Sequence, residues 1–130
     1  MPPRLNQETL RKATVYIGEK NYYERQQLRE LFLAQGLKQI VCHATLDALR
    51  DMLFQEPPDL LVVAADFDPG VFDFIKEIRT HRAGENPFML ISMMVTPTHR
   101  EVLMQAIEAG VDDIIIKPVS FETLLTKLPE

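Results

Sequence analysis

Five short apolar runs alternate with helical patterns along this chain, and that alternation restricts the possible folds more than any other feature. Each run is continuously apolar, as expected of strands that are buried on both faces. Strands of this kind separated by helices predict an α/β protein with a parallel sheet, helices on both faces and right-handed crossovers. The predicted strands are Thr14–Gly18, Gln39–Ala44, Leu60–Ala65, Phe88–Met94 and Asp113–Lys117.

Three of the intervening helices have an apolar face that residue spacing defines clearly. Thr45 is placed to cap the second of these helices, and Gly36 and Gly110 are placed to end the first and the third. A less regular helix is predicted over Phe72–Arg82, and a short last one over Phe121–Leu128. The three apolar faces are Leu28, Leu31 and Phe32; Leu46, Leu49, Met52 and Leu53; and Val102, Leu103, Ala106 and Ile107.

Length and charge narrow the class of protein. The 130 residues suit one domain, which we assign to residues 13–130 after a polar extension at 1–12. A net charge of −5 argues against nucleic-acid binding, and no basic run favours an anionic membrane surface. The single cysteine, Cys42, fits a reducing compartment and is expected to be a small buried apolar residue. No apolar stretch approaches the roughly 20 residues that span a bilayer, so we expect a cytoplasmic protein.

The carboxyl ends of the strands are the expected place for a functional site. In open parallel sheets, ligands bind outside these ends, where the strand order reverses. The sequence places acids, a hydroxyl and a lysine there, and such groups are the parts of a phosphate pocket. The segments expected to converge are Gly18–Lys20, Ala64–Asp68, Ser92–Met94 and Lys117–Pro118.

Three stretches make the chain resemble a response-regulator receiver domain of two-component signalling. They are "PDLLVV", "NPFMLIS" and, most specifically, "EAGVDDIIIKPVSFETLL", and the likeness runs from about Ala13 to Leu128. The resemblance implies a flavodoxin-like, doubly wound, five-stranded parallel sheet of order 2-1-3-4-5. It also implies a signalling module with a histidine kinase or another signalling protein as partner, and not an enzyme beyond phosphoacceptor chemistry. Finally, it implies a cis Lys117–Pro118 bond, with Lys117 paired to Asp66 or Glu19.

Receivers accept a phosphoryl group on an aspartate, with help from Mg²⁺, a lysine and a hydroxyl. By this resemblance Lys117 is the lysine and Ser92 the hydroxyl. The paired acids that follow the first strand in the family are here Glu19 and a lysine, Lys20. The acceptor position falls on Ala64, counted from Pro58, or on the next alanine, counted from Pro69. The resemblance therefore predicts a receiver with a degenerate phosphorylation site.

Three functions follow from these residues. The leading one is a degenerate receiver that acts through protein–protein contacts, without a cofactor and without ordered Mg²⁺. The second is an active but atypical receiver, phosphorylated on Asp66 with Mg²⁺ held by Glu19 and Asp66. The third is a small phosphohydrolase, since Asp66-Phe67-Asp68 after an apolar strand resembles the first motif of haloacid-dehalogenase phosphatases. Asp66 and Asp68 also suit an ordinary solvated turn.

The resemblance also predicts where partners bind. Receivers commonly associate through the fourth helix, fifth strand and fifth helix. A short last helix would leave apolar surface uncovered near Ile114, Leu124 and Leu128, so we expect self-association there. Ile114 stands where many members carry the aromatic residue that moves on phosphorylation. The histidines, such as His43, have no metal-binding spacing and are expected at the surface or at strand edges.

Overall fold

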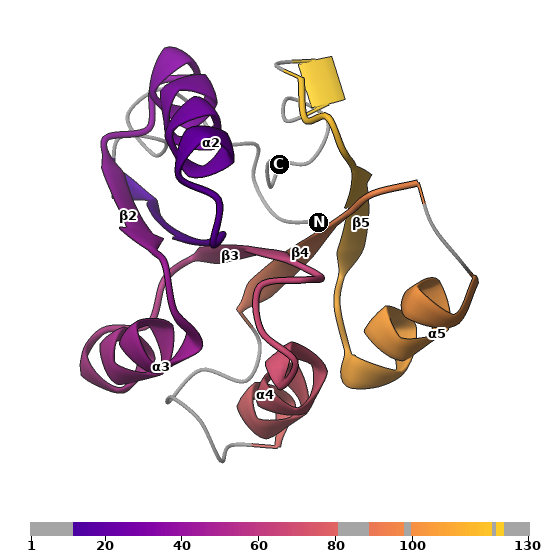
Figure 1. The fold of residues 1–130 in the computed structure, drawn as a ribbon. Coiled ribbons are helices and arrows are strands. Elements are labelled where there is room, and N and C mark those ends of the chain that lie inside the picture. Colours follow the sequence, from indigo (N-terminus) through magenta and orange to yellow (C-terminus); the bar gives the residue numbers. More distant parts are fainter. Residues whose placement is uncertain (1–11, 81–88, 98–99, 121, 124–130) are drawn as a thin grey trace, which may run out of the picture.

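The computed structural model describes residues 12–80, 89–97, 100–120 and 122–123, and in this part of the chain five strands form one parallel sheet (Figure 1). The strand order is β2-β1-β3-β4-β5, which confirms the predicted order. Each strand begins and ends within two residues of its predicted range. The strands are β1 (Thr14–Gly18), β2 (Gln39–His43), β3 (Leu60–Ala64), β4 (Leu90–Val95) and β5 (Asp113–Ile116).

Helices cover both faces of the sheet. Figure 1 shows α2 on one face, with α3, α4 and α5 on the other. None of the described helices is both long enough and apolar enough to cross a membrane. The helices are α2 (Tyr22–Ala34), α3 (Leu46–Gln55), α4 (Val71–Arg79) and α5 (Arg100–Ala109). Of the predicted last helix, Phe121–Leu128, the structure describes only Glu122 and Thr123, which are helical, and most of the extension at 1–12 lies outside the described residues.

Local sequence accounts for the helix ends. Asn21 caps α2 by accepting a hydrogen bond from the backbone N–H of Glu24 at 3.0 Å. Thr45 caps α3 in the same way, as predicted. Gly36 and Gly110 follow the ends of α2 and α5 with φ values of 99° and 105°, where a side chain would be strained.

The core lies on both sides of β3, all of whose residues are buried. Two sequence predictions about burial are wrong. Ile107 is predicted on the buried face of α5 but is exposed, because the helix turns Ala106 and Ala109 toward the protein instead. His43 was placed at the surface or an edge, yet it is only 5% exposed. Its ring packs edge-on against Tyr16, with 5.3 Å between the ring centroids.

Arg79, at the end of α4, joins three segments at the amino-terminal edge of the sheet. Its guanidinium donates hydrogen bonds to the carbonyls of Gly110 and Met89 at 2.9 and 2.7 Å. It also pairs with the carboxylate of Asp112 at 2.8 Å. A side chain at position 110 would meet the Arg79 side chain at 2.9 Å, so glycine is required there for space as well as for its backbone conformation.

Candidate functional site

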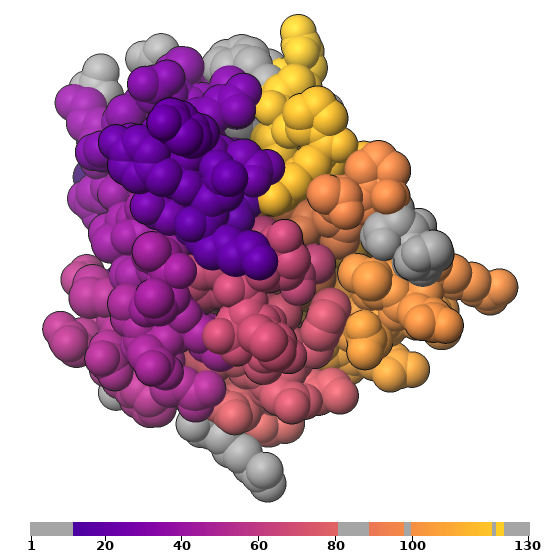
Figure 2. Space-filling view, in the orientation of Figure 1, coloured from indigo at the N-terminus to yellow at the C-terminus, as the bar shows by residue number. Residues whose placement is uncertain are grey.

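The carboxyl ends of β1, β3 and β5 lie close together at one edge of the sheet. Gly18 pairs with Val63 in the ladder, so Glu19, the next residue, is level with Ala64, where β3 ends. Figure 2 shows the indigo start of α2 in contact with the rose-coloured segment after β3 and with the yellow segment after β5. The edge is therefore formed by residues that are far apart in the sequence, as predicted.

Lys117 is the central charged group of this edge. Its Nζ lies 2.6 Å from Oε1 of Glu19 and 3.1 Å from Oε1 of Glu24. The Lys117 side chain is only 12% exposed and that of Glu19 2%. The Lys117–Pro118 bond is cis and the lysine is paired with Glu19, which confirms both predictions.

The pKa of Lys117 reflects two opposing effects. Burial lowers this pKa, because it removes the ammonium from water. The hydrogen bonds and negative charges of Glu19 and Glu24 outweigh burial and leave the pKa of Lys117 above its usual value. The ammonium is thus firmly charged at neutral pH.

The end of β1 places Glu19, and the first turn of α2 places Glu24. Glu24 is the third residue of the helix, and Asn21 is its N-cap. In a capping box, the carboxylate at this third position accepts the N–H of the cap residue. Here the Asn21 N–H donates to Oε2 of Glu19 at 3.3 Å instead, and Glu24 extends to Lys117. Glu24 was missed from the sequence, although its position three residues after Asn21 marks it as a first-turn carboxylate.

The loop after β3 has a different character. Ala64, the last residue of that strand, is fully buried and offers no side-chain oxygen. The Ala65 N–H donates to the carbonyl of Met94 at 2.9 Å, and Phe67 turns inward against Gly18. A Cβ built on Gly18 would lie 3.1 Å from the Phe67 ring, so the two residues are in close contact. The structure places an apolar side chain where the loop meets β1.

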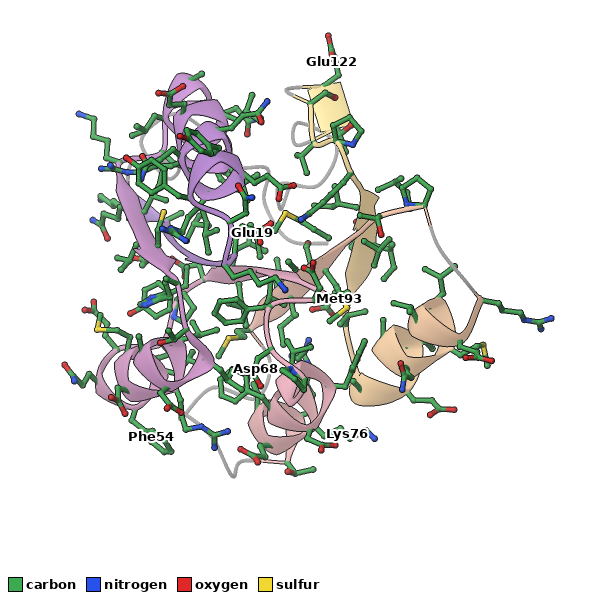
Figure 3. All side chains as sticks on the ribbon, in the orientation of Figure 1. Glu19, Phe54, Asp68, Lys76, Met93 and Glu122 are labelled. Atoms are coloured by element: carbon green, nitrogen blue, oxygen red, sulfur yellow. The ribbon has the colours of Figure 1, made fainter. Side chains whose placement is uncertain are left out.

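The two aspartates of this loop do not reach the lysine. Asp66 is 64% exposed, and its ion pair is with Lys20 at 3.9 Å. Asp68 accepts the backbone N–H of Gly70 at 2.7 Å, an Asx-turn at the start of α4. Figure 3 shows Glu19 beside α2 and Asp68 at the start of α4. Asp68 is thus a turn-forming residue.

Ser92 is not at the edge, and the prediction that it lies at the carboxyl end of its strand is wrong. It lies inside β4, beside Val62, and is buried. The apolar run continues through Val95, so the strand ends three residues later than Ser92. The hydroxyl that directly follows β4 belongs to Thr96, which is exposed. The length of the apolar run is the signal that could have identified it.

A small pocket of about 40 Å³ lies between α2 and the ends of β4 and β5. Glu19, Glu24 and Lys117 are its charged residues, and its other walls are largely apolar. The lining residues are Glu19, Glu24, Gln27, Leu28, Leu31, Met94, Lys117, Pro118 and Val119.

The side chains at this edge do not fit Mg²⁺, the cation that receivers use. A hard divalent cation needs several free oxygen ligands. The oxygens of Glu19 are bonded to Lys117 and Asn21, and Asp66 lies beside the ammonium of Lys20. Over the described residues, no three carboxylate, histidine or cysteine groups are arranged to hold a metal ion.

The predicted association surface is partly described. Ile114 is half-buried, whereas Leu124 and Leu128 lie outside the described residues. Ile116 of β5, together with Ile107 and Met104 of α5, is exposed.

Comparison with known proteins identifies solved structures that share this fold. No family model and no curated protein matches the sequence. Chemotaxis protein CheY4 of Vibrio cholerae is 19% identical, with a TM-score of 0.75 over 88% of this chain and 94% of its own. A response regulator from Thermotoga maritima is 17% identical, with a TM-score of 0.75 over 88% and 92%. A CheY-like receiver domain protein from Methanospirillum hungatei is 18% identical, with a TM-score of 0.76 over 88% and 89%. The chain has the fold of response-regulator receiver domains.

Proposed function

We propose that the chain is a receiver-like module of two-component signalling that acts by binding other proteins, not by accepting a phosphoryl group. One observation carries the proposal: the lysine of the site is bonded to Glu19 and Glu24, while the end of β3 is the buried Ala64. An aspartyl phosphate requires an aspartate carboxylate within reach of the lysine and the metal. In the described residues that carboxylate has no counterpart.

The charges at the edge support a module without a metal-dependent switch. An ammonium about 4 Å from a divalent site costs on the order of 1 kcal/mol per charge even in water, and more where the site is half-buried. Lys20 is such a charge next to Asp66. In the loop after β3, the apolar ring of Phe67 packs against Gly18, so packing holds this loop in place.

The proposed partners are a histidine kinase or another signalling protein in the cytoplasm, and a second copy of the chain. Self-association would use α5, β5 and the segment after it, where Met104, Ile107 and Ile116 are exposed beside Ile114. Because phosphorylation is not the trigger, this association should be constitutive. Sedimentation at micromolar concentration is expected to show self-association that acetyl phosphate does not change and that Ile107→Asp weakens. A monomer that dimerises only with acetyl phosphate would contradict this.

An active receiver phosphorylated on Asp66 is the second candidate, because the carboxylate of that residue is accessible to a phosphodonor. Intact mass after incubation with acetyl phosphate and Mg²⁺ separates the two. We expect no phosphoryl adduct. An adduct that disappears in Asp66→Asn but persists in Asp73→Asn, an exposed aspartate of α4, would refute the proposed function. Release of phosphate without an adduct would instead favour the phosphohydrolase.

A further inference from the structure

Lys117 has more negative charge around it than its own charge requires. Glu19, at 2.6 Å and almost fully buried, is sufficient to neutralise one ammonium. Glu24 adds a second carboxylate at 3.1 Å and brings the three side chains to a sum of −1. Glu24 is available because Glu19 accepts the Asn21 N–H in its place. The second carboxylate is therefore built into the first turn of α2.

We infer that Glu24 supplies, from within the chain, the negative charge that a phosphoryl group would place beside the lysine of a phosphorylatable receiver. The ion pairing of the Lys117 ammonium then depends on the first turn of α2 and not on the loop after β3. This inference rests on the proposed function, because it assumes that no aspartyl phosphate competes for the lysine.

Because Glu24 is more exposed than Glu19, we expect the contacts of Lys117 to be regulated at the first turn of α2. Glu24 is 46% exposed, whereas Glu19 is almost completely covered. The neighbouring Tyr22 and Tyr23 are also exposed and stack edge-on, with 5.6 Å between ring centroids. A protein that contacts this turn can displace Glu24 from Lys117 and leave the pair with Glu19 in place.

The backbone links Lys117 to the ends of two strands. Its N–H donates to the carbonyl of Val95, the last residue of β4, at 2.8 Å. Lys117 also directly follows Ile116, which is exposed at the end of β5. A change in the partners of the Lys117 side chain is therefore expected to alter the ends of β4 and β5, beside the proposed association surface.

The test compares Glu24→Gln with Glu30→Gln, which removes the same charge from an exposed position of the same helix. Glutamine preserves the size and the helix propensity of glutamate, so both variants should fold. Trace acylation followed by peptide mass spectrometry reports the reactivity of the Lys117 amine. We expect reactivity several-fold above wild type in Glu24→Gln and unchanged in Glu30→Gln. Glu24→Asp, which keeps a shorter carboxylate, should give an intermediate value.

Amide chemical shifts give the second readout. Those of Val95, Ile116 and Lys117 are expected to move in Glu24→Gln and to stay in place in Glu30→Gln. Unchanged reactivity of Lys117, or increased reactivity without these shifts, would overturn the inference. A phosphoryl adduct on the wild-type protein would instead refute the proposed function, so the two failures are distinguishable.

Discussion

Two halves of the same sheet edge differ in what their side chains do. On the β1–β5 side, Glu19, Glu24 and Lys117 form a mostly buried, hydrogen-bonded group of charges. On the β3 side, the strand ends in alanine and the loop turns Phe67 into the protein. The polar partners of the lysine therefore come from the end of β1 and the first turn of α2, whereas the β3 side contributes packing. In this fold the lysine is therefore held by Glu19 and Glu24, without an aspartate from the end of β3.

The largest expected effect tests the β3 side. Phe67→Ala removes a buried ring that packs against Gly18, and large-to-small changes of this kind cost about 4 kcal/mol through lost burial and a cavity. Urea unfolding should show this loss, while Phe54→Ala, at an exposed position of α3 (Figure 3), should change the unfolding free energy by less than about 1 kcal/mol. Equal losses in the two variants would mean that the loop is not held by packing.

The next effect tests the charged side. Lys117→Met leaves the carboxylate of Glu19 buried without its cation, and breaking a buried pair from one side costs about 3 kcal/mol. Lys20→Met removes the same charge from an exposed ammonium 3.9 Å from Asp66, for which we expect less than about 0.5 kcal/mol. Chemical denaturation of both variants gives the comparison. Similar losses of unfolding free energy in the two variants would show that the Lys117–Glu19 pair contributes no more than an ordinary surface ion pair.

The smallest effect concerns pH and His43, whose carbonyl accepts the Glu19 N–H at 3.2 Å. Burial lowers the pKa of His43 from 6.5, and among the described residues its Nε2 has no hydrogen-bond partner. The unfolded chain therefore binds this proton at a higher pH than the folded protein does. Stability from His43 is complete above pH 6.5 and falls as pH drops toward the folded pKa, by at most about 1.4 kcal/mol per pH unit.

Melting temperatures from pH 7.5 down to pH 5 test this, with His43→Phe as the control that keeps an aromatic ring beside Tyr16. The variant should lose less stability than wild type over this range. Parallel curves for the two proteins would show that folding does not change the pKa of His43.

The sequence was sufficient to predict the sheet, because continuous apolar runs and cap residues act locally. Thr45, Gly36 and Gly110 each have the role that their residue type favours. The cis peptide and the Lys117–Glu19 pair were predicted from the family resemblance. Ser92 was misplaced because counting along an apolar run does not reveal which of its residues is level with the end of the neighbouring strand.

Other parts of the site depend on contacts that one sequence does not show. Glu24 reaches Lys117 only because Glu19 takes over the N–H of the cap residue, and that exchange depends on where β1 ends. The inward turn of Phe67 depends on the absence of a side chain at Gly18. The buried position of His43 likewise depends on Tyr16 of the neighbouring strand. The proposed metal-free state and the self-association remain predictions.

The contacts of Arg79 have a consequence for how this molecule can move. They join the end of α4, the start of β4 and the turn between α5 and β5 at the amino-terminal edge of the sheet. That edge therefore joins β4 and β5 to α4, whereas their opposite ends, at Val95 and Ile116, are joined to α2 through the ion pair of Lys117 with the accessible Glu24. Any rotation of these two strands that a partner induces should have its pivot near Gly110 and its greatest amplitude beside Lys117.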